Sequence, residues 1–280
     1  MTILPFNGHA VGIILKELVR RAILTIRNER QMFEVAAKPG HGGGMDDMFT
    51  SADTKAQKVY VKSLTECFPD IPVVAEEGAA ALGTDSRVSF TVDPLDGAKA
   101  FVRRQSHGVG TMVALVQDGQ VVSAFVGDVN TQEIYGYRPD STKVHRITEY
   151  ETSEQLTPGT TPLAGRCVLL RDPPEGYSEH ARKLPPSFKS YEVEGGSIGT
   201  WMARLWKDEV GAVLLPPGPV NPWDNAPVIG ISAVIGLGFY RPTGDGWERY
   251  MPTVGSRVVC PSHDLLVMPP GNAPVLSLPA

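Results

Sequence analysis

The segment RVSFTVDPLDG places two carboxylates directly after an apolar stretch. Val88, Phe90 and Val92 alternate with other residues, a pattern that predicts a strand. Asp93 and Asp96 follow, three residues apart and separated by a proline. Because Pro and Asp-Gly are ordinary turn formers, the simplest interpretation is a solvated surface turn. A chemical role needs further acidic residues that would meet this pair in the fold.

Three other segments place acidic residues at the expected end of a strand or start of a helix. VVAEEG has Glu76 and Glu77 after an apolar strand, GMDDMFTSAD has Asp47 before a helix, and NPWDNAP has Asp224 at a helix start. Each has a structural explanation alone, as strand-end solvation, a turn or a helix cap. Carboxylates that converge on one sheet edge, however, repel one another unless a cation lies between them. Together the segments therefore indicate a hard divalent cation such as Mg²⁺, which prefers oxygen ligands.

The first half of the chain has the pattern of two helices packed on a largely antiparallel sheet. Apolar residues between Ile14 and Ile26 recur at helical spacing. A second helix is expected at TSAD, with Thr50 or Ser51 as the N-cap and Asp53 in the first turn. Strand patterns follow in IPVVA, RVSFTV and EIYGYR, and an Asp-Gly pair joins two more β-rich runs into a hairpin.

A polar, turn-rich segment at 139–163 marks the expected boundary between two halves. Beyond it, strand and helix patterns alternate from RCVLL to the helix near Trp223, which is typical of α/β layering. We therefore expect an α+β half over 1–138, which holds most metal ligands, and an α/β half over 139–280, which supplies Asp224 and substrate contacts. The segment KPGHGGGMDD is expected to lack regular structure.

Composition restricts the classes of partner. The 280 residues carry a formal charge of -5, which argues against general nucleic-acid binding. Three widely spaced cysteines form neither a disulfide framework nor a zinc-site spacing. The first residues lack a signal-peptide pattern, and no apolar stretch is long enough to cross a bilayer. We expect a soluble cytoplasmic protein with no membrane or nucleic-acid partner.

The segments TSAD, AEEG, DPLDGAKAF and PWDNAP, in this order and at these separations, resemble the inositol monophosphatase superfamily, as does GSIGT ahead of a helix. This superfamily of Mg²⁺-dependent, lithium-sensitive phosphatases includes 3'(2'),5'-bisphosphate nucleotidases. The resemblance spans nearly the whole chain. It implies an αβαβα layered sandwich, between the α+β and α/β classes, and a phosphomonoesterase that hydrolyses a small soluble phosphate ester by attack of a metal-activated water. We also expect a homodimer.

The resemblance further implies a set of metal ligands for two or three Mg²⁺ ions. Glu76, Asp93 and the backbone carbonyl of Leu95 would bind the first ion. Asp93 would bridge to a second ion held by Asp96 and Asp224, and a third, weaker ion would use Glu76. Paired metals of this kind stabilise both the attacking and the leaving oxygen of an in-line displacement.

The expected phosphate and substrate contacts are Gly97, Ala98, Lys99, Ser197 and Thr200. Backbone N–H groups near Gly97 and Ala98 are suited to phosphate oxygens if a helix begins there. Ser197 and Thr200 are expected at the start of another helix, from which they would reach a substrate.

Ala98 departs from the family pattern, because members usually carry threonine at this position. That hydroxyl is thought to work with the aspartate matched to Asp47 in orienting and deprotonating the nucleophilic water. Without it, Glu76 is the better candidate for the general base, and the role of Asp47 is open. A slower enzyme, a changed mechanism and a non-catalytic regulatory protein all stay open.

A second departure concerns the substrate. Inositol-specific members carry a glutamate where this chain has Pro217, which weakens the case for an inositol phosphate. The segment DGAKAFVRR is instead similar to segments of 3'-phosphoadenosine 5'-phosphate phosphatases, through Lys99, Phe101, Arg103 and Arg104. Histidinol phosphate and sugar phosphates are further alternatives.

Overall fold

The computed structural model of the chain describes residues 7–38, 47–77, 83–244 and 246–272, apart from the side chains of Lys38 and Asp47. Its helices are α1 (Gly8–Glu29), α2 (Ser51–Cys67), α3 (Ala98–Val102), α4 (Glu179–Arg182), α5 (Ile198–Trp206) and α6 (Pro222–Ile235). Among the helices of these residues, none combines the length and the apolar character that a bilayer span requires.

The first sheet has seven strands in the order β3-β4-β5-β6-β7-β8-β9. Its strands are β3 (Val73–Ala75), β4 (Val88–Asp96), β5 (Gly110–Gln117), β6 (Gln120–Asp128), β7 (Ile134–Tyr137), β8 (His145–Ile147) and β9 (Ser153–Gln155). Only β3 and β4 pair in parallel, which confirms the antiparallel-rich sheet. Asp118 and Gly119 both have positive φ in the predicted hairpin turn, as a tight two-residue turn requires.

The second half contains a six-stranded mixed sheet in the order β11-β10-β12-β15-β13-β14. Its strands are β10 (Cys167–Leu170), β11 (Ser190–Val193), β12 (Ala212–Leu215), β13 (Gly238–Pro242), β14 (Trp247–Arg249) and β15 (Leu265–Met268). Strand β10 pairs in parallel with β11 and β12, whereas the pairs involving β13, β14 and β15 are antiparallel.

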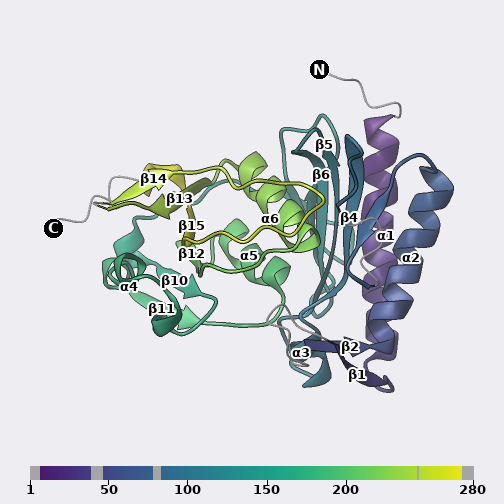
Figure 1. Ribbon diagram of the computed structural model, residues 1–280, viewed down its shortest axis with the longest axis horizontal. Coiled ribbons are helices and arrows are strands. Elements are labelled where there is room, and N and C mark those ends of the chain that lie inside the picture. Colours follow the sequence, from purple (N-terminus) through teal and green to yellow (C-terminus); the bar gives the residue numbers. More distant parts are fainter. Residues whose placement is uncertain (1–6, 39–46, 78–82, 245, 273–280) are drawn as a thin grey trace.

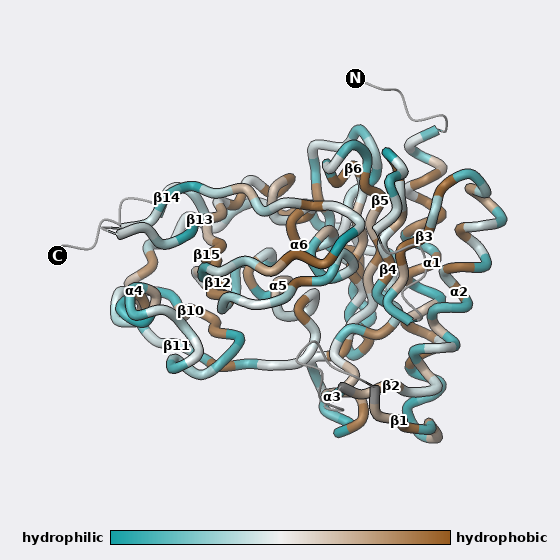
Figure 2. Tube along the Cα trace, in the orientation of Figure 1, coloured by the Kyte–Doolittle hydropathy of each residue, from teal (hydrophilic) through white to brown (hydrophobic). Residues whose placement is uncertain are grey.

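The helices and the two sheets stack as alternating layers, which confirms the αβαβα sandwich (Figure 1). Helices α1 and α2 cover the outer face of the first sheet, α5 and α6 lie between the sheets, and α4 lies on the far side of the second sheet. A separate hydrophobic core fills each junction between a helix layer and its sheets. Figure 2 shows apolar residues along the strands and α6, with polar residues on the outer turns.

Both N-terminal helices begin as their sequences predict. The side chain of Asn7 accepts hydrogen bonds from the first-turn N–H groups of α1. At the start of α2, Thr50 and Asp53 form a capping box in which the Asp53 carboxylate accepts from the backbone N–H and the hydroxyl of Thr50. Helix α2 is therefore fixed at the end that follows β2.

Two expectations about irregular segments need correction, and several strands were not expected. The segment KPGHGGGMDD does not interrupt all regular structure, because its ends belong to the antiparallel strands β1 (Val35–Lys38) and β2 (Asp47–Thr50). The expected turn at DPLDG is instead a continuation of β4 through Asp96. Strands β13, β14 and β15 were not expected. Strands β8 and β9 lie beyond the expected boundary at residue 139, and the division into two halves stays a prediction.

Trp206, at the end of α5, joins the helix layer to the first sheet. Its side chain is 1% exposed, and its ring packs on that of Tyr135 in β7 with centroids 5.9 Å apart. Its indole N–H donates to the hydroxyl of Ser232 on α6 over 2.9 Å. One side chain of α5 therefore contacts both α6 and β7.

Trp206→Ala should lower the free energy of unfolding by about 3–5 kcal/mol, because it removes the largest buried side chain of this junction. Ser232→Ala should cost about 1–3 kcal/mol, because the buried indole N–H loses its acceptor. Urea denaturation followed by circular dichroism measures both. Tyr191→Ala, at a half-exposed position on β11, is the matched control. Equal losses for Trp206→Ala and this control would contradict the prediction.

Candidate metal centre

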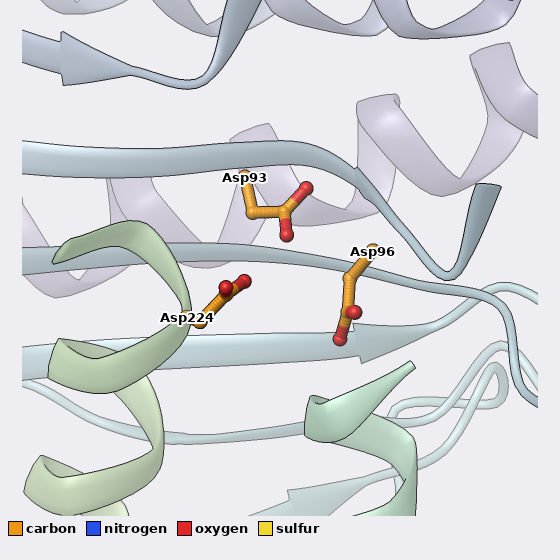
Figure 3. Close-up of side chains that lie close together, drawn as sticks. All are labelled: Asp93, Asp96 and Asp224. Carbon is orange, nitrogen blue, oxygen red and sulfur yellow. The ribbon is translucent and has the colours of Figure 1, made fainter. Parts of the chain in front are cut away.

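Three carboxylates from two distant segments of the chain lie close together, at the end of β4 and the start of α6. Asp93 and Asp96 come from β4, and Asp224 lies in the first turn of α6. One oxygen of each lies within 4.8 Å of the others, and the three side chains lie close together (Figure 3). Asp93 is 3% and Asp96 7% exposed, so little water reaches these charges. The convergence predicted from the separate segments is confirmed for these three residues.

A bulge in β4 puts both of its aspartates on one side of the strand. Residues three apart point to opposite faces of a regular strand. Here Asp93 lies opposite Met112 and Asp96 opposite Gly110, so three steps along β4 match two along β5. The extra residue reverses the alternation. The Asp93 carboxylate also accepts a hydrogen bond from the backbone N–H of Leu95, whose side chain is buried in the core.

Asp96 is held by the N-terminus of α5. Its carboxylate accepts hydrogen bonds from the backbone N–H groups of Ile198 and Gly199, at 3.1 and 2.8 Å, and from the hydroxyl of Ser197 at 2.5 Å. A negative charge is favourable at this end of a helix. Burial and the neighbouring Asp224 nevertheless outweigh these donors and raise the pKa of Asp96 to about 6.

The negatively charged form of Asp93 is destabilised more than that of Asp96. Burial raises its pKa well above the usual range, and the charges of Glu76, Asp96 and Asp224 raise it further. Glu76 follows β3, and its backbone N–H donates to the carbonyl of Val92, next to Asp93. The charge of Glu76 therefore acts on Asp93, although Glu76 lies outside the 4.8 Å cluster of the described residues, and its role as a metal ligand stays a prediction.

Several supporting residues were not found from the sequence. The hydroxyl of Thr111 donates to the backbone carbonyl of Asp93 and lies 2.9 Å from that of Tyr60 on α2. The side-chain amide of Asn221 donates to Asp224 over 3.0 Å. Gln57 on α2 both donates to the carbonyl and accepts from the N–H of Glu77, at 2.7 and 2.9 Å. These bonds fix the backbone or side chain of each acidic segment.

The turn after Asp96 requires glycine. Gly97 has φ of +89°, and a Cβ there would lie 2.2 Å from the carbonyl oxygen of Gly108 and 2.7 Å from the backbone nitrogen of Ser197. A helix does begin after this turn, since α3 starts at Ala98. Ala98 is partly buried and Lys99 exposed, and their contacts with phosphate stay predictions.

The other expected site residues have different outcomes. Ser197 is fully buried, and its hydroxyl donates to Asp96 and accepts from the N–H of Thr200. This geometry gives Ser197 a part in holding Asp96, and a substrate contact by Ser197 or Thr200 stays a prediction. Asp47 begins β2, but its side chain lies outside the described residues, so its catalytic role is also still a prediction. The same holds for the carbonyl of Leu95 as a ligand.

A family model described as the inositol monophosphatase family matches residues 9–264 of the chain. The chain belongs to the inositol monophosphatase family. Similar curated proteins are the Nus factor SuhB of Vibrio cholerae, 32% identical over 92 residues, and the inositol-1-monophosphatase of Rhizobium meliloti, 35% identical over 92 residues. Each alignment spans 33% of this chain and 34% of the relative, so about a third of either protein is matched.

Solved structures of the family share the fold over almost the full chain. The suhB protein of Bartonella henselae has a TM-score of 0.74 at 17% identity, covering 96% of this chain and 97% of that one. The Thermotoga maritima IMPase has a TM-score of 0.69 at 17% identity, covering 92% and 91%. An IMPase/NADP phosphatase complexed with Mg²⁺ and phosphate has a TM-score of 0.71 at 16% identity, covering 96% and 94%. At these identities the likeness establishes the fold alone.

The raised pKa of Asp96 makes the stability of the metal-free family member depend on pH. Between about pH 4 and pH 6 the unfolded chain releases the Asp96 proton while the folded chain keeps it. The free energy of unfolding should therefore fall by about 1.4 kcal/mol per pH unit from this group alone. Denaturation of the wild type and of Asp96→Asn in chelator, over this range, measures the difference. A difference between the two that does not change with pH would contradict the prediction.

Gln57→Ala should weaken Mg²⁺ binding about tenfold or more, because the segment that carries Glu76 and Glu77 loses its attachment to α2. Isothermal titration with Mg²⁺ measures the affinity, and thermal melting in chelator shows whether the fold is retained. Lys58→Ala, at the exposed neighbouring position on α2, serves as the control. Equal affinities for the two variants would show that this attachment does not position the acidic segment.

Proposed function

We propose that the protein is a Mg²⁺-dependent phosphomonoesterase that hydrolyses a small phosphate ester. The observation that carries this proposal is the buried group of Asp93, Asp96 and Asp224, with the charge of Glu76 beside it, on the fold of a phosphatase family. The related IMPase/NADP phosphatase that contains Mg²⁺ and phosphate supports both the metal and the class of ligand.

The donor set fits a hard divalent cation. All side chains of the cluster offer carboxylate oxygens, and their mutual repulsion in a buried site is relieved by a positive charge. Asp93, Asp96 and Asp224 would hold Mg²⁺, together with Glu76 and the carbonyl of Leu95. When bound, Mg²⁺ lowers the pKa of a coordinated water and stabilises negative charge on the phosphoryl group and the departing oxygen.

The remaining chemistry belongs to groups around the cluster. Glu76 is the first candidate to take the proton from water, and Asp47 is the second. Asp47 is the first residue of β2, and Ala98 is the first residue of α3. These two elements pack against each other, so Asp47 belongs to a segment next to the turn at Gly97 and Ala98, where phosphate would bind. Ala98 carries no hydroxyl that could orient the water. We therefore expect hydrolysis to be slower than in family members that have threonine at this position.

The fold does not choose between polyol and nucleotide substrates. Related structures include SaIMPase-II with inositol monophosphate and the same enzyme with 2'AMP, and an IMPase/NADP phosphatase with NADP and Ca²⁺. A 3'(2'),5'-bisphosphate nucleotidase is therefore the main alternative within the phosphatase class. Three exposed basic residues follow the turn at Gly97, namely Lys99, Arg103 and Arg104. Their positive charges favour a substrate with additional negative charge.

A regulatory, non-catalytic role is the second candidate function. Ala98 favours it, and so do the curated relatives named Nus factor SuhB. The intact carboxylate cluster argues against it, because buried like charges destabilise a protein that has no use for a cation. The two candidates differ in whether Mg²⁺ produces turnover.

Asp93→Asn should abolish both Mg²⁺ binding and phosphate release, a larger loss than the roughly 10–100-fold typical of an outer-shell partner. Phosphate release from inositol phosphate, 3'-phosphoadenosine 5'-phosphate, histidinol phosphate and p-nitrophenyl phosphate, with and without Mg²⁺, is the assay. Melting in chelator should show the variant at least as stable as the wild type, because one repelling charge is gone. Wild-type rates in Asp93→Asn would refute the site assignment.

Ala98→Thr separates the two candidate functions. A hydroxyl at this position should raise kcat by about 10-fold or more if water orientation limits the rate, since positioned proton transfer contributes about 10²–10⁴-fold. Turnover by the wild type with no gain in Ala98→Thr would show that another group has taken the role. A lack of Mg²⁺-dependent turnover in both proteins, across the whole panel, would favour the regulatory function.

A further inference from the structure

Helix α6, which carries Asp224 in its first turn, begins without a side-chain cap. Helices α1, α2 and α5 each begin at a side chain that accepts hydrogen bonds from first-turn N–H groups. At the start of α6 this position is Asn221, whose side chain accepts no such bond in the described structure and whose amide donates to Asp224 instead. Asn221, Asp224 and Asn225 also border a cavity of about 480 Å³, so packing on that side does not fix the helix start. Other contacts must therefore hold the turn that carries Asp224.

The segment 253–261 between β14 and β15, hereafter the strap, supplies such contacts. The side-chain amide of Asn225 donates to the carbonyl of Thr253 over 2.8 Å. Val220 and Val259 exchange two backbone hydrogen bonds, at 2.8 and 3.1 Å. Of these bonds only the first uses a side chain of α6, so Asn225 is the residue through which the strap acts on the helix. The strap has no carboxylate of its own and therefore adds no acidic ligand to the cluster.

The strap is also attached to the segment that leads into β4. The backbone N–H of Gly83 donates to the carbonyl of Ser256 over 2.7 Å, and the hydroxyl of Ser256 donates to the carbonyl of Thr84 over 2.8 Å. Between these two attachments, Val254 is 9% exposed and belongs to the core that contains residues of α5, α6 and the first sheet. One segment thus joins the start of α6 to the chain that enters the strand of the other two aspartates.

We propose that the strap positions Asp224 for the metal in place of a helix cap, with Asn225 and Ser256 as the positioning residues at its two attachments. The ligands of a metal keep their geometry only when supporting residues hold them. Because β4 and α6 carry carboxylates that repel one another, a link between the two elements limits how far the cluster opens when no ion is bound. The inference rests on the proposed binding of Mg²⁺ at this cluster.

The first test removes each attachment. Asn225→Ala and Ser256→Ala should each weaken Mg²⁺ binding about 3–10-fold, since each removes one hydrogen bond of the link. Isothermal titration measures the affinity, and melting in chelator shows whether each variant is folded. The hydroxyl of Ser256 donates to a backbone carbonyl, so its effect on the cluster has to pass through the strap. Ser256→Thr, which keeps the hydroxyl, should retain the wild-type affinity, and equal weakening by the Thr and Ala variants would overturn the proposal.

Arg257→Ala, on the same segment, is the matched control. The Arg257 guanidinium pairs with Asp85 at 3.3 Å, but 73% and 95% of the two side chains are exposed. Such an exposed pair contributes little, so the Mg²⁺ affinity should stay within about 2-fold of the wild-type value. A loss as large as that in Ser256→Ala would show that any change in the strap weakens binding, which contradicts the role given to Ser256.

The double variant Asn225→Ala/Ser256→Ala tests whether the two residues act through one link. If they do, the second substitution should add little to the loss of Mg²⁺ affinity, because the first has already broken the connection. Single losses that multiply in the double variant would show two independent effects and overturn the proposal.

Amide hydrogen exchange in chelator tests the strap without the metal. Peptides from the first turns of α6 should exchange faster in Asn225→Ala and Ser256→Ala than in the wild type and Arg257→Ala, because the helix start opens more often. Faster exchange in a protein whose wild type binds no Mg²⁺ would refute the proposed function and leave the hold of the strap on Asp224 intact. Unchanged exchange and affinity in both variants of a protein that binds Mg²⁺ would overturn the strap and leave the proposed function standing.

Discussion

The repulsion among buried carboxylates is the interaction on which the arrangement of the site depends. Asp93 and Asp96 are almost inaccessible to water; the charges of Asp96 and Asp224 raise the pKa of Asp93, and the charge of Asp224 raises the pKa of Asp96. The two carboxylates accept different numbers of hydrogen bonds from the protein. Asp96 receives three hydrogen bonds from the start of α5, whereas Asp93 has the N–H of Leu95 and several negative neighbours. A cation bound among these groups would therefore reduce the electrostatic repulsion most at Asp93. This is expected of a carboxylate that two ions share.

The layered fold explains how such a cluster can persist in the folded chain. Helices α5 and α6 lie between the sheets, and both begin next to the end of β4. The N-terminal ends of these helices carry partial positive charge, which partly offsets the acidic side chains. The backbone of Asp93 is fixed from the other side through Thr111 and Tyr60, whose burial raises its pKa and keeps its hydroxyl neutral. The first sheet and the helices α5 and α6 thus meet at the cluster, and each supplies part of what stabilises it.

Local patterns were sufficient for much of the fold. Capped amphipathic helices such as α1 and α2, and the Asp-Gly hairpin between β5 and β6, carry their signals within a few residues. Strands β13 and β14 were missed because they follow a helix in a segment rich in Gly, Pro and charged residues. The bulge between Asp93 and Asp96 was also missed, since it depends on pairing with β5.

The same distinction applies to the candidate site. Acidic residues at strand and helix ends predicted the cluster, because the topology of a sheet brings such ends together. Gln57 and Thr111 were not found, because a side chain that bonds to a distant backbone group leaves no pattern in the sequence around it. Ser197 was named from the sequence, but for a different role. Its position at a helix start suggested a contact with substrate, whereas in the structure its hydroxyl donates a hydrogen bond to Asp96.

Asp224 connects two regions that face different physical demands. On one side it belongs to the carboxylate cluster, where position and charge must be matched to a cation within fractions of an ångström. On the other side it borders a cavity whose proline-rich wall connects β12 to α6 on the surface of the molecule. Because that wall contributes little to the hydrophobic cores, its sequence can change without disturbing the cluster.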